Sequence, residues 1–303
     1  MLTEILTSIL ACPRCQGSLE QRATDLYCSS CRAAFAVRDG IPRMSTEAER
    51  ADERMAAEWE AQAHAHALYI DPAFIMNSWE KAVLPRLFDW IGAIDGPVLD
   101  AGCGIGKLGT ALTNRGRNGA AKSAPIVGFD FQGTLLAEAG PGYEALVEAD
   151  VHHLPFKSQS FAAAIASNSL HHFPDANQAM RELARVLRPG GVLVTYDPRF
   201  LEPLEAVKKM LRKNDDAFTK DHKAFRVDEY RDLLGSSGLQ VDEVRTVDPL
   251  GPLLATAFDY LKVGRLGVAP RIADSLAALD DFICGADGRT LAGLMLAGRA
   301  VKA

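Results

Sequence analysis

The stretch PVLDAGCGIGKLG, residues 97–109, joins a short hydrophobic run to an acidic residue and a loop with glycine at every second position. A short apolar run that ends in glycines is typical of a buried strand in a parallel sheet. Glycine also lets a backbone approach a bound nucleotide closely. The stretch therefore predicts a strand, a ligand-binding loop and the start of a helix.

Short apolar runs and helical segments alternate on both sides of this loop. Strand-like runs are expected at 97–102, 125–130, 145–150, 161–169 and 192–198. Helical segments are expected at 107–116, 132–139 and 174–191, and the last of these ends in Pro-Gly-Gly. Such alternation predicts an α/β fold, with a doubly wound parallel sheet and helices on both of its faces.

The loop GIGKLG, residues 104–109, also matches the GxGxxG fingerprint of dinucleotide-binding proteins. Asp100 argues against that ligand, because a carboxylate so near the loop would repel a pyrophosphate. It suits a cationic ligand such as S-adenosylmethionine, which carries a sulfonium and an ammonium group and no phosphate. A dinucleotide-dependent oxidoreductase remains an alternative.

Two further acidic residues follow the next strand-like runs. Asp130 ends the run PIVGFD, where a carboxylate can accept both hydroxyls of a ribose. Asp150 follows the third run and precedes Leu-Pro-Phe, so it could accept the amino group of adenine. Each acid alone also fits a helix cap or a turn, and their order along the chain favours the cofactor site.

Five motifs together resemble a known family. VLDAGCGIG, VGFD, ADVHHLPF, SNSLHHF and LRPGGVLVTYDP stand in the order typical of class I S-adenosylmethionine-dependent methyltransferases, most closely the methyltransferase type 11 group. The resemblance covers residues 75–303 and implies a Rossmann-like, seven-stranded sheet and EC class 2.1.1. It implies cofactor contacts from Asp100, Gly102, Gly104 and Gly106 (methionine side), Asp130 (ribose), Phe131 (beside adenine), Asp150 and Val151 (adenine edge), and Ser167 (end of the fourth strand).

Four of the six cysteines lie in the first 31 residues, as CPRC, twelve residues, CSSC. Two CxxC pairs at hairpin spacing predict a structural zinc site with four thiolate ligands, in preference to a redox pair. A bound metal replaces the core that about 40 residues cannot build. We therefore expect a zinc ribbon over residues 1–43, with the ligands Cys12, Cys15, Cys28 and Cys31.

The end of this module, FAVRDGIPRM, resembles the small zinc-ribbon activator subunit of tRNA, rRNA and release-factor methyltransferases. A ribbon fused to a methyltransferase is also similar to bacterial large-subunit rRNA guanine methyltransferases. The resemblance implies RNA as an alternative substrate. Residues 1–43 carry five arginines, no lysine and four acidic residues, a near-neutral balance that fits a stabilising or substrate-capping role at least as well.

The segment SNSLHHF follows the fourth predicted strand, at the edge where doubly wound sheets bind ligands. Transfer of a methyl group to a hydroxyl or ammonium requires a base that removes the proton. His171 and His172 are the candidates for that base. Both histidines could instead serve only in packing or hydrogen bonding.

The remaining segments complete the expected layout. Residues 44–95 are expected to form a helical linker or cap, and residues 96–303 the methyltransferase domain. Inserted helical cover is expected at about 200–235 and 250–285. The second of these segments is long and apolar, and such cover suits a small or partly apolar acceptor better than a structured RNA.

Composition sets the class of protein. The chain has 303 residues, 48% hydrophobic and 24% charged, with a net charge of −6 and no apolar run long enough for a membrane helix. We expect a cytoplasmic methyltransferase that acts on a small molecule of specialised metabolism. The alternatives are an RNA base methyltransferase and a non-catalytic subunit that binds a partner protein. The oligomeric state and the methylated atom are not indicated.

Overall fold

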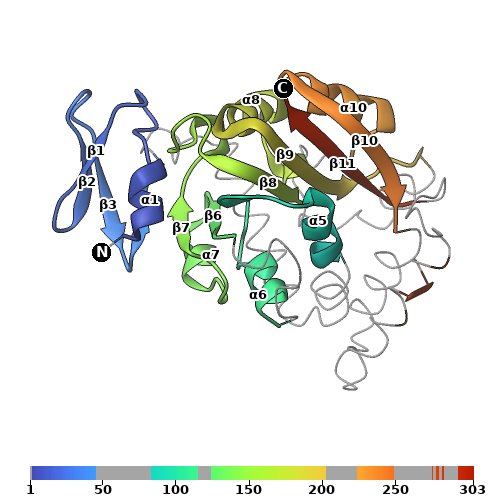
Figure 1. Ribbon diagram of the computed structural model, residues 1–303, viewed down its shortest axis with the longest axis horizontal. Coiled ribbons are helices and arrows are strands. Elements are labelled where there is room, and N and C mark those ends of the chain that lie inside the picture. Colours follow the sequence, from blue (N-terminus) through green and yellow to red (C-terminus); the bar gives the residue numbers. More distant parts are fainter. Residues whose placement is uncertain are drawn as a thin grey trace, which may run out of the picture.

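A computed structural model describes residues 2–45, 83–114, 124–202, 224–248 and 293–303, together with positions 275, 278, 279 and 282. Figure 1 shows two bodies joined side by side, a small N-terminal module and a larger domain built on a twisted sheet. None of the described helices has the length and apolar character of a membrane span.

The larger domain contains a seven-stranded sheet with the order β10-β11-β9-β8-β5-β6-β7. Strands β5 to β9 pair in parallel, whereas β11 runs antiparallel to both of its neighbours, β9 and β10. The doubly wound, Rossmann-like sheet of the sequence prediction is therefore confirmed, with one reversed strand. The strands are β5 (Val98–Ala101), β6 (Ile126–Asp130), β7 (Ala145–Glu148), β8 (Phe161–Ser167), β9 (Leu187–Pro198), β10 (Leu239–Val247) and β11 (Met295–Lys302).

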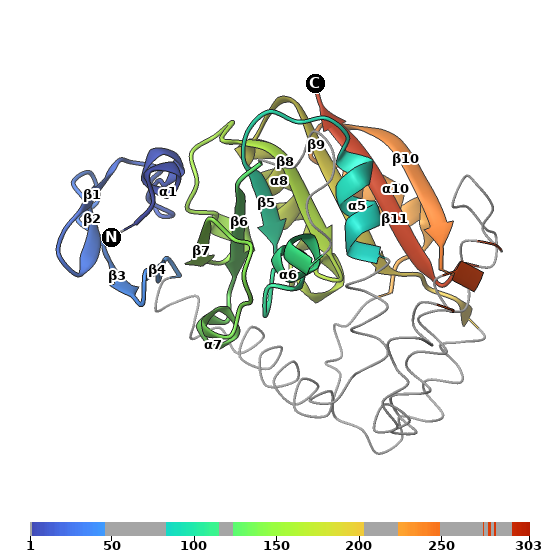
Figure 2. The same ribbon diagram turned by 60° about the horizontal axis from the view of Figure 1, so that its bottom comes forward.

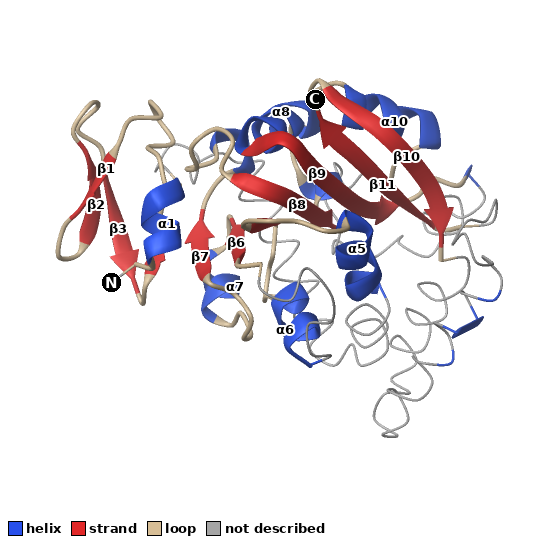
Figure 3. Cartoon of the chain, viewed as in Figure 1, coloured by secondary structure: helices blue, strands red, loops and turns tan. Residues whose placement is uncertain are grey.

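Helices cover both faces of this sheet (Figures 2 and 3). Helices α5 (Leu84–Ile91) and α6 (Lys107–Asn114) pack on one face, and α8 (Ala176–Val186) and α10 (Val227–Gly235) on the other. Side chains of β9 alternate between the two cores, since Val194 faces α5 and Leu193 faces the other core. Shorter elements follow the central strands: α7 (Gly133–Ala137), η3 (Val151–His153) and η4 (Leu170–His172).

One local prediction needs adjustment, and one that rested on position is confirmed. Helix α8 ends at Val186, and strand β9 already begins at Leu187, so Pro-Gly-Gly 189–191 lies within the strand and not at the helix end. The alanine-rich run from Phe161 to Ser167 is a strand in which every residue is buried. Its position between two neighbouring strands overrides the helical preference of alanine.

The N-terminal module begins with a short helix that the sequence reading did not predict, α1 (Glu4–Ile9), capped by the Thr3 hydroxyl. Four antiparallel strands follow, β1 (Leu19–Gln21), β2 (Asp25–Cys28), β3 (Ala34–Arg38) and β4 (Ile41–Pro42). Buried side chains of this module, among them Leu26 and Phe35, join the same hydrophobic core as β5 and α8.

The module docks on the free edge of β7 directly after β4 (Figure 2). Arg43 forms a parallel bridge with Glu148, and the Met44 amide donates to the Glu148 carbonyl at 2.7 Å. The Glu148 carboxylate pairs with the Arg43 guanidinium and accepts a 3.0 Å hydrogen bond from the Ser45 hydroxyl. Gly133 lies against this ion pair, where a side chain would collide with it.

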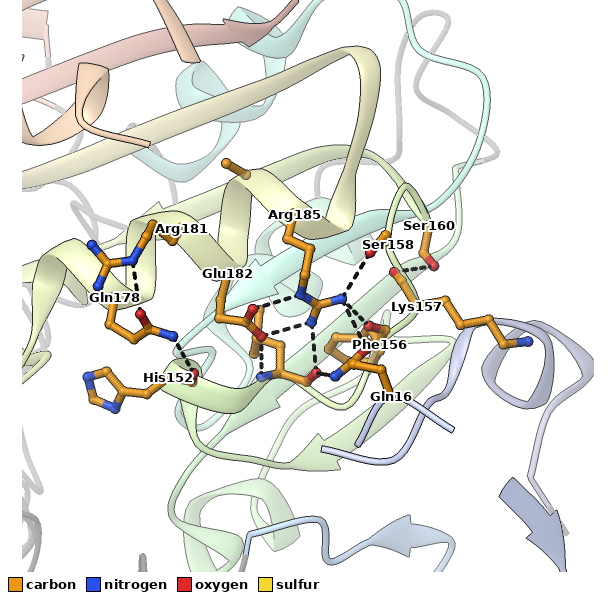
Figure 4. A network of polar contacts seen from close by, with 12 residues as sticks. Gln16, His152, Phe156, Lys157, Ser158, Ser160, Gln178, Arg181, Glu182 and Arg185 are labelled. Atoms are coloured by element: carbon orange, nitrogen blue, oxygen red, sulfur yellow. Dashed lines mark hydrogen bonds and ion pairs between the residues drawn. The ribbon is translucent and has the colours of Figure 1, made fainter. Parts of the chain in front are cut away.

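A second contact joins the first cysteine loop to the segment after η3. The Ala11 amide donates to the Pro155 carbonyl at 2.9 Å, and the Lys157 amide donates to the Ile9 carbonyl at 2.8 Å. Arg185 of α8 donates to four groups around this segment, the Gln16 side chain, the carbonyls of Leu154 and Phe156, and the Ser158 hydroxyl (Figure 4). Backbone pairing and side-chain contacts together fix the module on the larger domain.

Several predicted segments lie outside the described residues. These are most of the helical linker at 44–95 and most of the two cover segments, at 203–223 and 249–292. The domain boundaries at residues 43 and 95 remain predictions.

We expect Glu148→Ala to lower the free energy of unfolding by about 3 kcal/mol, because it leaves the largely buried Arg43 guanidinium without its partner. The measurement is urea unfolding followed by circular dichroism. The double variant Arg43→Met/Glu148→Met is the control, and it should lose less than Glu148→Ala because no charge stays buried. Equal losses would mean that the ion pair does not hold the module.

Candidate functional site

The predicted site residues converge on the carboxyl edge of the parallel strands. The glycine loop follows β5, Asp130 ends β6, Asp150 follows β7 and Ser167 ends β8. The register places these strands side by side in the order β8-β5-β6-β7. Doubly wound sheets bind their ligands at this edge, so the residues share one candidate site.

The glycine loop has a backbone that other residues would strain. Gly102, Gly104 and Gly106 all have positive φ angles, of 71°, 51° and 74°. The amides of Gly102 and Cys103 both donate to the Phe129 carbonyl, at 3.0 and 2.9 Å. The loop is thereby tied to the end of β6.

Asp130 makes the second link between the loop and β6. Its carboxylate accepts hydrogen bonds from the Gly104 amide and the Gln132 amide, both at 2.9 Å. Burial raises the pKa of Asp130, and these amide donors act in the opposite direction. Phe131 lies next in the chain, at the start of the turn that leads into α7.

Asp100 receives a hydrogen bond from a residue that the sequence reading missed. The Tyr143 hydroxyl donates to the Asp100 carboxylate at 2.5 Å and accepts the Gly109 amide at 3.3 Å. Asp100 is only 5% exposed. Burial raises the pKa of Asp100 to about 7, the Tyr143 hydrogen bond lowers it, and nearby Asp130 raises it.

The Tyr143 ring explains the spacing of the glycines. A Cβ added at Gly106 or Gly128 would lie 2.9 Å from a ring carbon of Tyr143, and one added at Gly109 would collide with the same ring. The third glycine of the GxGxxG pattern therefore makes room for an aromatic side chain of this chain. Tyr143 stands in the loop before β7, where no periodic pattern in the sequence singles it out.

Asp150 is the N-cap of η3. A helix cap is the role that the sequence allowed as an alternative to cofactor binding. Its carboxylate accepts the His152 amide at 2.9 Å and lies 2.6 Å from His152 Nδ1. The Asp175 amide donates to His152 Nε2 at 3.2 Å, so His152 carries its proton on Nδ1. Val151 is buried beside Asp150. The cap holds the Asp150 carboxylate at the edge of β7.

Ser169 contributes a buried polar atom beside the glycine loop. The residue is 4% exposed, and its hydroxyl has no hydrogen-bond partner among the residues that the structure describes. A Cβ added at Gly102 would lie 2.8 Å from the Ser169 Cβ and 3.6 Å from its hydroxyl. An unsatisfied buried hydroxyl is costly, so its presence here points to a ligand group.

The two candidate histidines occupy η4 and have different surroundings. His171 is buried, and its Nδ1 lies 2.8 Å from a carboxylate oxygen of Asp197, which also accepts the His171 amide. The other oxygen of Asp197 accepts the Tyr230 hydroxyl at 2.9 Å. The His172 ring packs against the His171 ring, with centroids 4.0 Å apart. A positive charge on His172 acts to lower the pKa of Asp130.

Asp197 lies in the core and is fully inaccessible to solvent. Burial raises the pKa of Asp197 to about 8, whereas hydrogen bonds from Tyr230 and from the amides of His171 and Leu170 lower it. Neither Asp197 nor Tyr230 was singled out from the sequence. Their partners are distant in the chain, and only the fold brings them together.

The four cysteines of the module form one cluster. Their sulfur atoms all lie within 4.8 Å of one another, and the pairs Cys12–Cys31 and Cys15–Cys28 are 3.5 Å apart. A tetrahedral zinc with bonds of about 2.3 Å needs sulfurs about 3.8 Å apart, so the cluster fits this metal.

The two cysteine loops have matching backbones. The amide of the residue after each CxxC donates to the carbonyl of the first cysteine at 2.8 Å, from Gln16 to Cys12 and from Arg32 to Cys28. Both residues have positive φ, 57° and 62°. Two equivalent loops that face one another are the arrangement that four-cysteine zinc ribbons use.

We expect Ser169→Ala to raise the stability of the ligand-free protein by about 1 kcal/mol, because it removes a buried hydroxyl that has no partner among the described residues. The measurement is the shift in thermal midpoint, with Ser167→Ala as the neighbouring control. A lower midpoint for Ser169→Ala would show that the hydroxyl has a structural partner.

Comparisons with known proteins agree with the two bodies of the fold. Residues 99–195 match the family model described as a methyltransferase domain, and residues 3–40 match the model described as Trm112p-like protein. The chain is 33% identical to the methyltransferase GfsG of Streptomyces halstedii over 181 residues, which cover 57% of this chain and 65% of GfsG.

Two further matches extend the comparison. The human protein named probable tRNA methyltransferase 9B is 32% identical over 150 residues, 46% of this chain and 30% of that protein. The chain thus spans between 30% and 65% of the length of these curated relatives. A chain from the complex that contains the Haloferax volcanii Trm112 methyltransferase activator has the same fold, with 17% identity and a TM-score of 0.50, over 83% of this chain and 98% of that chain.

The motifs of the larger domain and the cysteine cluster of the module fall within the two matched regions. The chain therefore joins an N-terminal Trm112p-like domain to a methyltransferase domain.

Proposed function

We propose that this protein transfers a methyl group from S-adenosylmethionine to a small-molecule acceptor. The observation that carries the proposal is the set of three carboxylates, Asp100, Asp130 and Asp150, at successive strand ends around a glycine loop. The methyltransferase domain match over residues 99–195 contains all three. S-adenosylmethionine supplies an activated methyl group on a sulfonium.

The residues of this chain fit such a cofactor. Asp100 and the loop glycines Gly102, Gly104 and Gly106 would take its cationic methionine part, and the buried Ser169 hydroxyl offers a polar partner there. Asp130 and Phe131 would hold the ribose and flank the adenine. Asp150 and Val151 would bind the adenine edge, and Ser167 would close the site at the end of β8.

A small-molecule acceptor agrees with how the N-terminal module uses its arginines. Arg43 pairs with Glu148, and Arg22 lies over the Tyr27 ring at 3.6 Å from its centroid. Residues 1–43 hold three further arginines and no lysine against four acidic residues, so the module carries little net positive charge for RNA phosphates, which dominate RNA affinity. The relative GfsG is named only as a methyltransferase, which is compatible with a small-molecule acceptor.

RNA is the second candidate acceptor, and a specific observation favours it. The module matches Trm112p-like protein, and one relative is named a tRNA methyltransferase. In that case the module would contact the RNA or assist the domain that does.

The test uses methyl-labelled S-adenosylmethionine, the purified full chain and cell extract, with and without ribonuclease pretreatment. Label is then measured in the organic-extractable, RNA and protein fractions. We expect ribonuclease-resistant label in the small extractable fraction. Ribonuclease-sensitive label would establish the RNA alternative, and no label above a Gly104→Val control would reject methyl transfer.

The raised pKa of Asp100 predicts how cofactor binding depends on pH. Protonated Asp100 is neutral and loses its attraction for a cation, so affinity should fall as pH drops below about 7. We expect the dissociation constant of S-adenosylmethionine to rise about fivefold between pH 7 and pH 6. The measurement is isothermal titration calorimetry.

Two variants sharpen this measurement. Asp100→Asn should bind S-adenosylmethionine weakly and with little pH dependence in this range. Tyr143→Phe should move the midpoint upward, because it removes the hydrogen bond that favours the ionised carboxylate. An unchanged pH profile in both variants would separate Asp100 from the cofactor.

We further propose that Cys12, Cys15, Cys28 and Cys31 hold a structural zinc. Purified protein should contain one zinc per chain, and Cys15→Ser or Cys31→Ser should lose it and lower the thermal midpoint, because the metal replaces a core. Cys103→Ala is the control and should keep the zinc. Metal content is measured by mass spectrometry, and full zinc in the cluster variants would refute the site.

A further inference from the structure

The His171–Asp197–Tyr230 cluster joins three separate elements. His171 lies on η4, Asp197 near the end of β9, and Tyr230 on α10. Each carboxylate oxygen of Asp197 has its own partner, His171 Nδ1 at 2.8 Å and the Tyr230 hydroxyl at 2.9 Å. All three residues are buried. Burying a carboxylate carries a desolvation cost, which hydrogen bonds offset only in part. The buried Asp197 therefore points to a role beyond packing.

Burial raises the pKa of Asp197, whereas the Tyr230 hydroxyl and the His171 amide donate to its carboxylate and favour the ionised form. When it is ionised, Asp197 accepts from His171 Nδ1, so the imidazole carries its proton there and its basic nitrogen is Nε2. The same carboxylate accepts the His171 amide at 3.2 Å, which fixes the backbone of the turn as well as the ring. The arrangement orients one basic nitrogen and stabilises the imidazolium that forms when this nitrogen takes a proton.

The cluster also lies at the edge of the sheet that carries the candidate cofactor site. His172 stacks on His171 and influences Asp130, and Ser169, two residues before His171, packs against Gly102. Among the residues that the structure describes, the titratable groups near the His171 ring are Asp197 on β9, Tyr230 on α10 behind Asp197, and His172 on the same turn, with Asp130 on β6 beyond His172.

We propose that His171 is the general base of methyl transfer, that Asp197 and Tyr230 are its positioning residues, and that the acceptor is therefore a hydroxyl or ammonium group. This inference rests on the proposed function. For a hydroxyl acceptor, its proton passes to His171 Nε2 and its oxygen forms a bond to the methyl carbon. The carbon–sulfur bond breaks, and its electron pair stays on the sulfur. His171 afterwards releases the proton to water.

The two positioning residues should move the proton affinity of the pair in opposite directions. Asp197→Asn removes the anion that favours the imidazolium, so the pair loses its proton at lower pH. Tyr230→Phe removes a hydrogen bond to the ionised carboxylate, so the pair keeps its proton to higher pH. A purely structural role for these residues predicts no such opposed shifts.

The experiment measures kcat and kcat/KM against pH, with the acceptor that the labelling assay identifies. The acid limb should move by about one pH unit or more, downward in Asp197→Asn and upward in Tyr230→Phe. At the plateau, kcat should fall about 10- to 100-fold in His171→Gln, with the dissociation constant of S-adenosylmethionine within about twofold of wild type.

A matched control lies one residue away. Tyr196 faces the opposite side of the sheet, where its hydroxyl donates to the buried Asp248 at 2.6 Å. Tyr196→Phe removes the same kind of hydrogen bond and should leave the acid limb in place. Selective ¹⁵N labelling of the seven histidines gives an independent titration, assigned with His171→Gln. Its His171 midpoint should shift as the acid limb does.

The outcomes distinguish a failure of the proposed function from a failure of the base role alone. No methyl transfer by the folded wild-type chain overturns the proposed function, and the base role with it. Methyl transfer that persists unchanged in His171→Gln overturns the base role alone. Shifts of the acid limb in the same direction, or none, in Asp197→Asn and Tyr230→Phe overturn their positioning role.

Discussion

The hydrogen bond from the Tyr143 hydroxyl to the Asp100 carboxylate is the interaction on which the candidate site depends. Tyr143 also fills the space left by three glycines, Gly106 in the loop, Gly109 on α6 and Gly128 on β6. The ring therefore packs against the loop, while the Asp130 carboxylate links the loop to β6 by accepting the Gly104 amide. A loop held from two directions presents its remaining groups in a defined geometry, which is a requirement for binding a small cofactor tightly.

The sequence predicted the alternation of strands and helices and the line of carboxylates because both depend on local patterns. Strand-like runs alternate with helices, and each acid stands at the end of its run. Asp150 shows the limit of such a reading. It is a helix cap as well as a candidate ligand, and the two roles do not exclude one another, since a cap is one way to fix a carboxylate in place.

The residues that the sequence could not reveal act through partners far away in the chain. Tyr143 lies 43 positions from Asp100, Tyr230 lies 33 from Asp197, and Arg43 lies 105 from Glu148. No period or spacing rule connects positions so far apart, because only the folded sheet brings them together. The helix α1 was missed for another reason, since six residues are too few for a helical period to stand out.

The docking of the N-terminal module on β7 has a consequence for synthesis of the chain. The module leaves the ribosome first, but the strand that receives it is made about 105 residues later. At ordinary elongation rates this delay is about 5–20 s. During that time the module must keep its own shape without its largest partner. When β7 is synthesised, the module of the same chain is already present to cover its unpaired edge. This edge is then protected from pairing with a strand of another molecule.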